Sequence, residues 1–338
     1  MEGIFHLGDF TLQSGVVLRE AFVGYETHGT LNADRSNVIL YPTWYGGTHV
    51  ANRGAIADGR TLDPSRYFIV VTDQFGNGLS SSPSNTPRPH DRMRFPLVTP
   101  YDNVAASHRL LTEEFGIERI ALVVGYSMSA QQAFHWAAVH PDMVERIAPI
   151  CGSAKTTPHD WLHLEAWRLA LTADAAWANG DYDAPPEKGM RAFIASVAAW
   201  FASQTYYREG KHLTFGGNRF DSMQAYLDGL AEAFGAMDAN DYLAMLATWQ
   251  SADVGNHPDF DGSLEAALGS ISCPAMVLPA ESDLYFPPAD SALAVSLMPN
   301  AELRVIPGIS GHLAGFPGIA SADEEAFIDR ALRDLLAL

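Results

Sequence analysis

The sequence predicts an α/β fold with a mostly parallel central sheet and a helical segment inserted into it. Short apolar runs alternate with helical patterns in the first half of the chain. The middle of the chain has helical patterns only, and strand-like runs return near the end. Strands covered by helices on both faces have this apolar composition, and alternation with helices is typical of parallel sheets joined by crossovers.

The predicted strands of the first half are short, largely apolar and rich in β-branched residues. They are residues 37–41, 67–72, 119–124 and 145–150. Between the second and the third of these, residues 102–115 carry apolar side chains at helical spacing and predict a crossover helix.

From about residue 157 to residue 266 no convincing strand is found. Helical spacing recurs there, as in residues 190–201 and 222–237, with turn signals between the pieces. Strand patterns return at 274–278 and 302–306, and residues 323–336 predict a last helix. The chain therefore divides into a first core segment (1–156), a helical insertion (157–266) and a second core segment (267–338).

Composition and charge exclude several classes of protein. Of the 338 residues 47% are hydrophobic and 18% charged, as in globular proteins with a sizeable core. A net charge of −19 repels phosphate backbones and anionic membranes, so we expect neither nucleic acid nor membrane as a partner. The N-terminus has no signal-peptide pattern, and only Cys151 and Cys273 are present. We expect buried, reduced thiols and a cytoplasmic location.

The strongest motif is Gly125-Tyr-Ser127-Met-Ser129, which follows an apolar run and precedes a helical pattern. It is close to the nucleophile elbow Gly-x-Ser-x-Gly, a tight strand-to-helix turn that holds a serine hydroxyl clear of the sheet. Ser129 replaces the second glycine and is small enough to allow the turn with some crowding. An ordinary small-residue turn is the alternative, and the strand and helix on either side favour the elbow.

A serine nucleophile needs a base and a carboxylate that orients the base, and elbow folds supply them in the order Ser, Asp/Glu, His. His312 lies in a glycine-rich loop after the last predicted strand. Asp283 directly follows the strand before it, with Glu281 as its rival. His257, in the helical insertion, competes with His312. Taken singly, His312 could be a structural loop histidine and Asp283 a helix N-cap.

The same chemistry needs N–H donors for an oxyanion. Met128, after the nucleophile, supplies one backbone N–H. The loop of residues 41–49 follows the first core strand, and its Gly46-Gly47 pair lets the backbone approach a ligand. Trp44 or Tyr45 could present the second N–H, unless the pair is an ordinary turn.

Metal and cofactor chemistry is not expected. His159 and His163 are four residues apart, a spacing that can hold zinc, but the segment lacks His-Glu-x-x-His. The sequence contains neither Gly-x-Gly-x-x-Gly nor a phosphate-binding Gly-Lys-Ser/Thr. We therefore expect no metal and no cofactor.

Several further stretches carry a family resemblance. They are Tyr25–Ala33, Thr61–Phe68, Phe95–Thr99, Ser127-Met128, Ser282–Pro288 and Gly311-His312. Through them most of the chain resembles the homoserine O-acetyltransferase family of α/β-hydrolases. The resemblance implies an α/β-hydrolase fold with a helical lid that is used for dimerisation. It also implies a catalytic triad of Ser127, Asp283 and His312, with oxyanion donors at Trp44 and Met128.

The sequence departs from this family where the acceptor would bind. The acetyltransferases place an aspartate after the catalytic histidine to hold the substrate ammonium, and Leu313 stands here. An apolar side chain cannot pair with a buried ammonium. The family's carboxylate-binding arginine has a counterpart in Arg168, which could instead form a salt bridge in the lid. Tyr45, in an unusually aromatic oxyanion loop, is a further candidate for contact with the substrate.

We therefore expect a serine carboxylic-ester hydrolase that acts on small, acetyl-type esters through an acyl-enzyme and forms a homodimer through its lid. The alternative is homoserine O-acetyltransferase or a related O-acyltransferase with acetyl-CoA as co-substrate. A non-catalytic binding protein on the same fold is a third possibility. The charge of −19 favours the hydrolase, because coenzyme A needs a basic patch and little beyond Arg168 and Arg88 could provide one.

Overall fold

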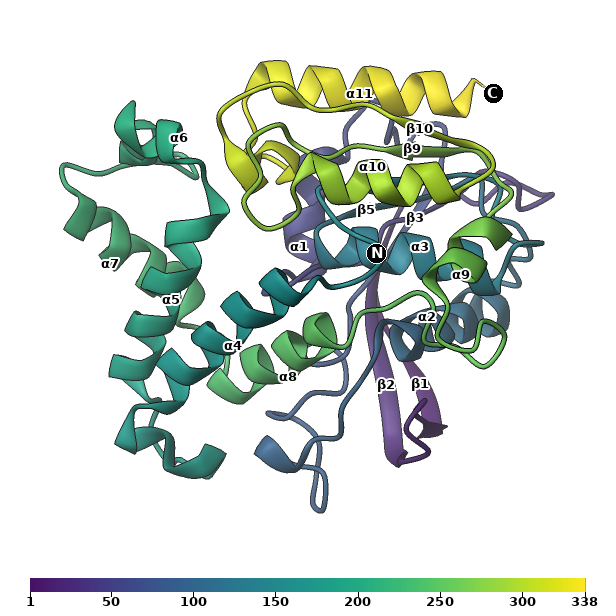
Figure 1. Cartoon of the computed structure of the whole chain (residues 1–338). Helices are drawn as coiled ribbons and strands as arrows, with labels where there is room; N and C mark the ends of the chain where they lie inside the picture. Colours follow the sequence, from purple (N-terminus) through teal and green to yellow (C-terminus); the bar gives the residue numbers. More distant parts are fainter. Residues whose placement is uncertain (338) are drawn as a thin grey trace.

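The computed structural model describes residues 1–337, which fold around one eight-stranded sheet with helices on both faces (Figure 1). The strand order is β1-β2-β4-β3-β5-β6-β9-β10. The strands are β1 (Glu2–Thr11), β2 (Val17–His28), β3 (Val38–Leu40), β4 (Phe68–Thr72), β5 (Leu122–Tyr126), β6 (Ile147–Ile150), β9 (Ala275–Val277) and β10 (Ala301–Leu303). In this order every neighbouring pair from β4 to β10 runs parallel, while β2 runs antiparallel to both of its neighbours, β1 and β4. This architecture is the α/β-hydrolase fold that the sequence predicts.

Alternate residues of the parallel strands enter two separate cores. In β3, Ile39 joins one hydrophobic cluster, while Val38 and Leu40 join the other. The second cluster includes side chains of α2 (Pro100–Arg109), α3 (Met128–Val139), α9 (Leu264–Ser270) and α10 (Pro288–Leu297). The first includes side chains of α11 (Ala322–Leu336) and of the helical insertion. The strands are apolar along their whole length because both of their faces are covered.

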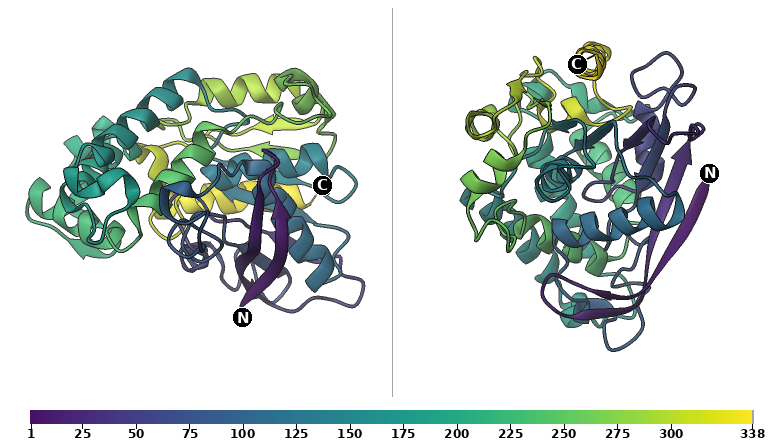
Figure 2. Two further views of the ribbon diagram at one scale, coloured as in Figure 1. Left: turned by 90° about the horizontal axis from the view of Figure 1, so that it is seen from below. Right: turned by 90° about the vertical axis from the view of Figure 1, so that its right-hand side faces the viewer.

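The insertion stands at one end of the sheet as a group of helices (Figures 1 and 2). Its main helices are α4 (Pro158–Thr172), α5 (Glu187–Phe201), α6 (Gln204–Arg208), α7 (Met223–Phe234) and α8 (Ala239–Gln250). Within it, α4 contacts α5 and α8, and α5 contacts α7. The expected boundary at residue 266 falls inside α9, which contacts α3 and α10 of the core instead. We call the helices α4 to α8 the lid.

All six predicted strands are present, and the structure adds two hairpins that were not predicted. The long hairpin of β1 and β2 forms one edge of the sheet (Figure 2). β1 is largely exposed, and in β2 the charged pair Arg19 and Glu20 interrupts the buried apolar residues, so neither strand shows a continuous apolar run. In the insertion, β7 (Thr214–Phe215) pairs with β8 (Asn218–Arg219), so the expectation of no strand there is wrong for this short hairpin. Its turn is Gly216-Gly217, where both glycines have positive φ (57° and 78°) as tight hairpin turns require.

Both cysteines are free thiols, as expected. Cys151 is buried, whereas Cys273 is only half-buried, so the expectation of burial is wrong for Cys273. It lies in the segment between α9 and β9, two residues before the strand begins. Among residues 1–337, no helix is long and apolar enough to cross a membrane.

One buried histidine predicts how stability depends on pH. His135 on α3 is fully buried, and desolvation lowers its pKa to about 4. The folded protein therefore keeps His135 neutral while the unfolded chain takes up a proton near pH 6.5, so stability is lost as pH falls below that value. Between pH 7 and pH 5 this single group costs about 2 kcal/mol.

We expect His135→Phe to flatten the decline in unfolding free energy between pH 7 and pH 5 by about this amount (~2 kcal/mol). Urea unfolding followed by circular dichroism at several pH values measures the difference. The altered packing in His135→Phe changes the unfolding free energy by the same amount at every pH, so the comparison uses only the slope of unfolding free energy against pH. Parallel curves for the two proteins would contradict the assignment.

Candidate active site

The carboxyl ends of three parallel strands bring the predicted chemical groups together. Ser127 follows β5, Asp283 lies in the loop after β9, and His312 lies in the short 3₁₀ turn Gly311–Gly315 after β10. Parallel strands end at the same edge of a sheet, and open α/β folds build their sites there.

These three side chains form one hydrogen-bonded chain. His312 Nε2 lies 3.0 Å from Ser127 Oγ, and His312 Nδ1 lies 2.8 Å from Asp283 Oδ2. Each residue is 5% exposed or less, so the bonds are shielded from water. The other oxygen of Asp283 accepts the backbone N–H groups of Tyr285 (2.9 Å) and Phe286 (3.2 Å). Asp283 is thus held in position while it orients the imidazole.

The rival residues lie elsewhere. Glu281 approaches only the backbone N–H of Gly308, at 3.4 Å. His257 packs against Tyr101 and pairs with Asp259 at 3.3 Å, away from the serine. Asp283 is not a helix cap either, because the residue before α10 is Pro287 and no side chain caps that helix.

The turn at Ser127 has the strained geometry of a nucleophile elbow. Ser127 has φ 58° and ψ −126°, and α3 begins at the next residue. A Cβ atom at Gly125 would lie 2.1 Å from the carbonyl oxygen of Ser129. A Cβ atom at Gly152, on the neighbouring strand end, would lie 2.6 Å from the carbonyl oxygen of Ser127. Glycine is therefore required at both positions, and a strained non-glycine residue persists because its surroundings fix it.

Ser129, in place of the second elbow glycine, is accommodated without distortion of the turn. It lies in the first turn of α3 and is fully buried. Its hydroxyl has no hydrogen-bond partner in the part of the chain that the structure describes. The extra atom is thus tolerated at the cost of one unsatisfied polar group.

Two backbone N–H groups are free beside the serine. Met128 is the first residue of α3, so its N–H has no partner within the helix. Trp44 follows Thr43, whose own N–H bonds to the carbonyl of Thr72 at 2.9 Å. Neither Met128 nor Trp44 donates its N–H to an acceptor within residues 1–337. The Trp44 ring is 4% exposed and packs edge-on against Tyr126 at 5.2 Å, which fixes this part of the loop.

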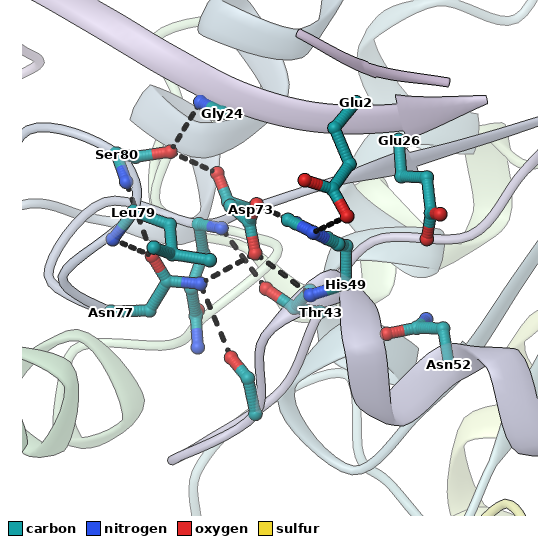
Figure 3. A network of polar contacts seen from close by, with 12 residues as sticks. Glu2, Gly24, Glu26, Thr43, His49, Asn52, Asp73, Asn77, Leu79 and Ser80 are labelled. Carbon is teal, nitrogen blue, oxygen red and sulfur yellow. Dashed lines mark hydrogen bonds and ion pairs between the residues drawn. The ribbon is translucent and has the colours of Figure 1, made fainter. Parts of the chain in front are cut away.

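A buried carboxylate that the sequence analysis did not select holds the same loop (Figure 3). Asp73 Oδ1 accepts the backbone N–H of His49 (2.9 Å) and the amide of Asn77 (2.8 Å). Asp73 Oδ2 lies 2.6 Å from His49 Nδ1. The Asn77 amide also donates to the carbonyl of Gly47 at 3.2 Å. The loop that carries Trp44 is therefore tied at its far end to one buried carboxylate.

The same network reaches the N-terminal hairpin. His49 Nε2 lies 3.6 Å from Glu2, and Arg53 pairs with both Glu2 (2.6 Å) and Glu26 (2.9 Å). The hydrogen bond to Asp73 and the nearby carboxylates raise the pKa of His49 despite its partial burial. Two signals in the sequence mark this network: Asp73 directly follows a predicted strand, and His49 ends the Gly-Gly loop.

The serine opens onto a cavity of about 730 Å³ between the sheet edge and the lid. Tyr45 and Leu313 line it, as do Ser127 and His312. Burial raises the pKa of Tyr45, so its hydroxyl stays protonated, and it has no hydrogen-bond partner among the described residues. The hydroxyl oxygen is itself buried, so Tyr45 contributes its ring to the cavity wall while its hydroxyl is an unsatisfied buried polar group.

Arg168 is not brought to the cavity. Its guanidinium forms a bidentate pair with Glu165, at 2.8 and 2.5 Å, one turn earlier on α4. The side chain is 41% exposed, and the residue is not part of the cavity wall. The structure therefore contains the lid salt bridge that was the alternative for Arg168.

One cluster carries the donor types that zinc binds. Ligand atoms of His159, Asp160 and His163 lie within 4.8 Å of one another at the start of α4. Asp160 Oδ1 and His163 Nδ1 are 4.0 Å apart, farther than two ligands of one tetrahedral zinc ion (about 3.3 Å). The second Asp160 oxygen already accepts the Thr157 N–H in a capping box. Capping accounts for this one oxygen, whereas Asp160 Oδ1 and both ring nitrogens of His163 have no hydrogen-bond partner among the described residues.

Comparisons with a family model, with curated relatives and with solved structures each match this chain over most of its length. A family model described as the alpha/beta hydrolase fold matches residues 37–318. An ethyl acetate hydrolase from Pseudomonas veronii is 40% identical, over 99% of this chain and 95% of that protein. A homoserine O-acetyltransferase from Chlorobaculum parvum is 32% identical, over 90% of this chain and 87% of that protein. The crystal structure of an acetylester hydrolase from Corynebacterium glutamicum has a TM-score of 0.94 and 37% identity, covering 100% of this chain and 96% of that one.

The elbow predicts an asymmetric effect of glycine substitution. We expect Gly125→Ala to destabilise the fold by about 2 kcal/mol or more, because its methyl group overlaps the Ser129 carbonyl. Gly269→Ala is the matched control: Gly269 lies in α9, and outside its own helix the nearest described atom to an added Cβ is the Leu297 carbonyl oxygen, at 3.9 Å; alanine also favours helix. Chemical denaturation measures both. Equal stabilities would contradict the tight turn.

The Asp73 network predicts a difference between two substitutions at one residue. His49→Asn keeps a donor near the Nδ1 position, whereas His49→Ala removes it and frees the loop. We expect the alanine variant to slow phosphonylation of Ser127 by a fluorophosphonate about tenfold or more, because the adduct's oxygen needs the loop N–H.

The asparagine variant should react within a few-fold of the parent rate. Mass spectrometry of the adduct over time gives the rate constants, and circular dichroism confirms folding of each variant. Equal rates for folded His49→Ala and the parent protein would show that the network does not position the loop.

Proposed function

The chain belongs to the α/β-hydrolase family, and we propose that this carboxylesterase hydrolyses small acetate esters through an acyl-enzyme on Ser127. The observation that carries the proposal is the hydrogen-bonded chain Ser127–His312–Asp283 at the floor of a cavity. The full-length similarity to an ethyl acetate hydrolase and an acetylester hydrolase supports acetate esters as substrates.

The geometry supports a two-step reaction. Ser127 Oγ attacks the ester carbonyl while His312 Nε2, 3.0 Å away, takes its proton. Asp283, bonded to Nδ1, fixes the tautomer and stabilises the imidazolium. The tetrahedral intermediate collapses, and His312 returns the proton to the departing alkoxide, which leaves as the alcohol. A water molecule then gives a proton to His312 and attacks the acetyl-enzyme. When this second intermediate collapses, His312 returns the proton to Ser127 Oγ and acetic acid leaves, ionising to acetate and a proton in solution.

The negative oxygen of each tetrahedral intermediate needs preorganised donors. The free N–H groups of Met128 and Trp44 are suited to this role because both belong to rigid parts of the site. Met128 is set by the start of α3, and Trp44 is set by its ring packing and by the loop that Asp73 holds. Donors that need no reorganisation are usually the largest contribution to acyl-transfer catalysis.

Acetyl transfer from acetyl-CoA to a hydroxyl acceptor is less well supported. The similarity to a homoserine O-acetyltransferase favours it, at the lower identity of 32%. No lysine or arginine occurs among the described residues that line the cavity, whereas coenzyme A carries several phosphates. Leu313, 2% exposed at the cavity wall, offers no charge to the ammonium of homoserine.

The remaining parts of the proposal concern assembly and location. The reaction needs no cofactor. Three apolar side chains on α4 are exposed, Trp161, Leu162 and Leu169, which supports a homodimer through the lid. The free thiols Cys151 and Cys273 support a reducing compartment such as the cytoplasm.

Hydrolysis and transfer are separated by what attacks the acetyl-enzyme. We expect the enzyme to release acetate from ethyl acetate in water without any acceptor, and Ser127→Ala to lose about 10³-fold or more of kcat. Proton release at constant pH measures the hydrolysis. Free coenzyme A, assayed as thiol with acetyl-CoA and homoserine, measures the transfer.

The alternative predicts coenzyme A release that depends strictly on added homoserine, with no acetate from the ester alone. That result would replace the hydrolase assignment. Activity retained in Ser127→Ala would place the nucleophile elsewhere, and fluorophosphonate labelling of the parent protein would then fail to modify Ser127.

A further inference from the structure

The cavity above Ser127 is much larger than the substrate of the proposed function requires. Its volume of about 730 Å³ lies in the range of sites that enclose drug-sized ligands. An acetate ester of a short alcohol fills only a small part of such a space. The position of the unfilled part of the cavity and the side chains that line it therefore indicate what else the site can bind.

The floor of the cavity leaves little of that space beside the carbonyl. The rings of Trp44, Tyr126 and Phe316 pack against one another there, with centroids 5.2 to 5.7 Å apart. The reacting carbonyl has to lie between Ser127 Oγ and the N–H groups of the loop, against these rings. The free volume therefore extends away from the floor, towards the lid.

On the lid side the wall is formed by apolar side chains of two helices. We call this part of the cavity the apolar arm; its wall consists of Phe193, Ile194, Val197 and Phe201 on α5, and Leu230 and Phe234 on α7. The carboxylates of the cavity, Asp238 and Asp241, belong to the start of α8 instead. Burial raises the pKa of Asp241 to about 7, so at neutral pH about half of the Asp241 carboxyl groups are protonated. The arm suits an uncharged hydrocarbon group.

The contacts of His312 decide which half of an ester reaches the arm. His312 has to protonate the departing alcohol oxygen, so the alcohol group leaves on the side of its imidazole. The ring of Tyr285 packs against that imidazole, with centroids 4.9 Å apart. The hydroxyl of Tyr285 donates to the backbone carbonyl of Val197 at 2.8 Å, so α5 is joined to the His312 side of the site. The apolar arm therefore lies on the side of the site where the alcohol half of the ester is bound, and not on the side of the acyl half.

We propose that the apolar arm binds the alkyl or aryl group of the alcohol, so that acetates of longer apolar alcohols are the preferred substrates. This inference rests on the proposed function, acetate ester hydrolysis at Ser127. Each methylene that moves from water into the arm raises kcat/KM by up to about fourfold, because apolar burial stabilises the bound transition state. Two ester series with the same total number of carbons separate the alcohol half from the acyl half.

The experiment measures kcat/KM for ethyl, butyl and hexyl acetate and for ethyl butanoate and ethyl hexanoate, by proton release below the solubility limits. We expect an increase of about tenfold or more from ethyl to hexyl acetate. The ethyl esters of the longer acids should not rise above ethyl acetate. A flat or falling acetate series, or a rise along the acyl series, would overturn the inference. Absence of hydrolysis for every ester would instead refute the proposed function itself.

A pair of tryptophan substitutions on α5 tests the location of the arm. Val197 is half-buried in its wall, whereas Ala199, two residues further, is exposed and outside the cavity. We expect Val197→Trp to lower the ratio of kcat/KM for hexyl acetate to that for ethyl acetate about tenfold or more. Ala199→Trp should keep the parent ratio.

A folded Val197→Trp enzyme with the parent ratio would refute the arm as the alcohol site. Phe234→Ala, which widens the arm from α7, provides a second variant if Val197→Trp does not fold. It should raise the ratio for an acetate of a bulky aryl alcohol relative to ethyl acetate. If both folded variants keep the parent kcat/KM ratios, the assignment of the apolar arm as the alcohol site is wrong.

Discussion

The alignment of the parallel strands is the constraint on which the site depends. Ladders between β3 and β5, between β5 and β6 and between β6 and β9 keep their carboxyl ends at one edge of the sheet. Ser127 and Asp283 follow the carboxyl ends of β5 and β9, and His312 follows that of the neighbouring strand β10. The strands are buried on both faces, so a one-residue slip would move every side chain into the opposite core, whose close packing it does not fit. The positions of the loops are therefore determined by the core and not by the loops themselves.

Two buried carboxylates then convert this coarse alignment into precise geometry, and they work in the same way. Asp283 and Asp73 each accept a histidine Nδ1 on one oxygen and a backbone N–H on the other. Asp283 orients the imidazole of His312, the proposed base, whereas Asp73 orients the loop that carries Trp44. A carboxylate with its oxygens satisfied in this way is stable without water, and it fixes its partners more rigidly than a neutral acceptor would.

The sequence allowed those parts of the site to be predicted whose signals are local. Ser127 stands in a motif, and Asp283 and His312 follow predicted strands in an order that few chains show by chance. The Asp73–His49 pair was missed because each residue also fits a common local explanation, a strand end or a turn. For Arg168 the resemblance left two alternatives, a substrate contact or a salt bridge in the lid, and the structure contains the salt bridge, to Glu165 three residues earlier. The edge hairpin was not predicted because β1 is largely exposed and β2 mixes charged with apolar residues, so neither has the continuous apolar run of the central strands.

The lid determines which nucleophile can reach the acyl-enzyme, a property that Ser127 and its neighbours do not determine. Hydrolases and acyltransferases with this arrangement share the acyl-enzyme and differ in what reaches it. A charged acceptor or a polyphosphate donor would need basic groups at the cavity wall, and the described lining has none in a chain of net charge −19. An apolar lid wall recruits uncharged ligands by burial, and an alcohol product departs without leaving an unpaired charge behind. Water then remains as the small nucleophile that needs no binding site of its own, which is why the chemistry of the lid, more than that of Ser127, favours hydrolysis.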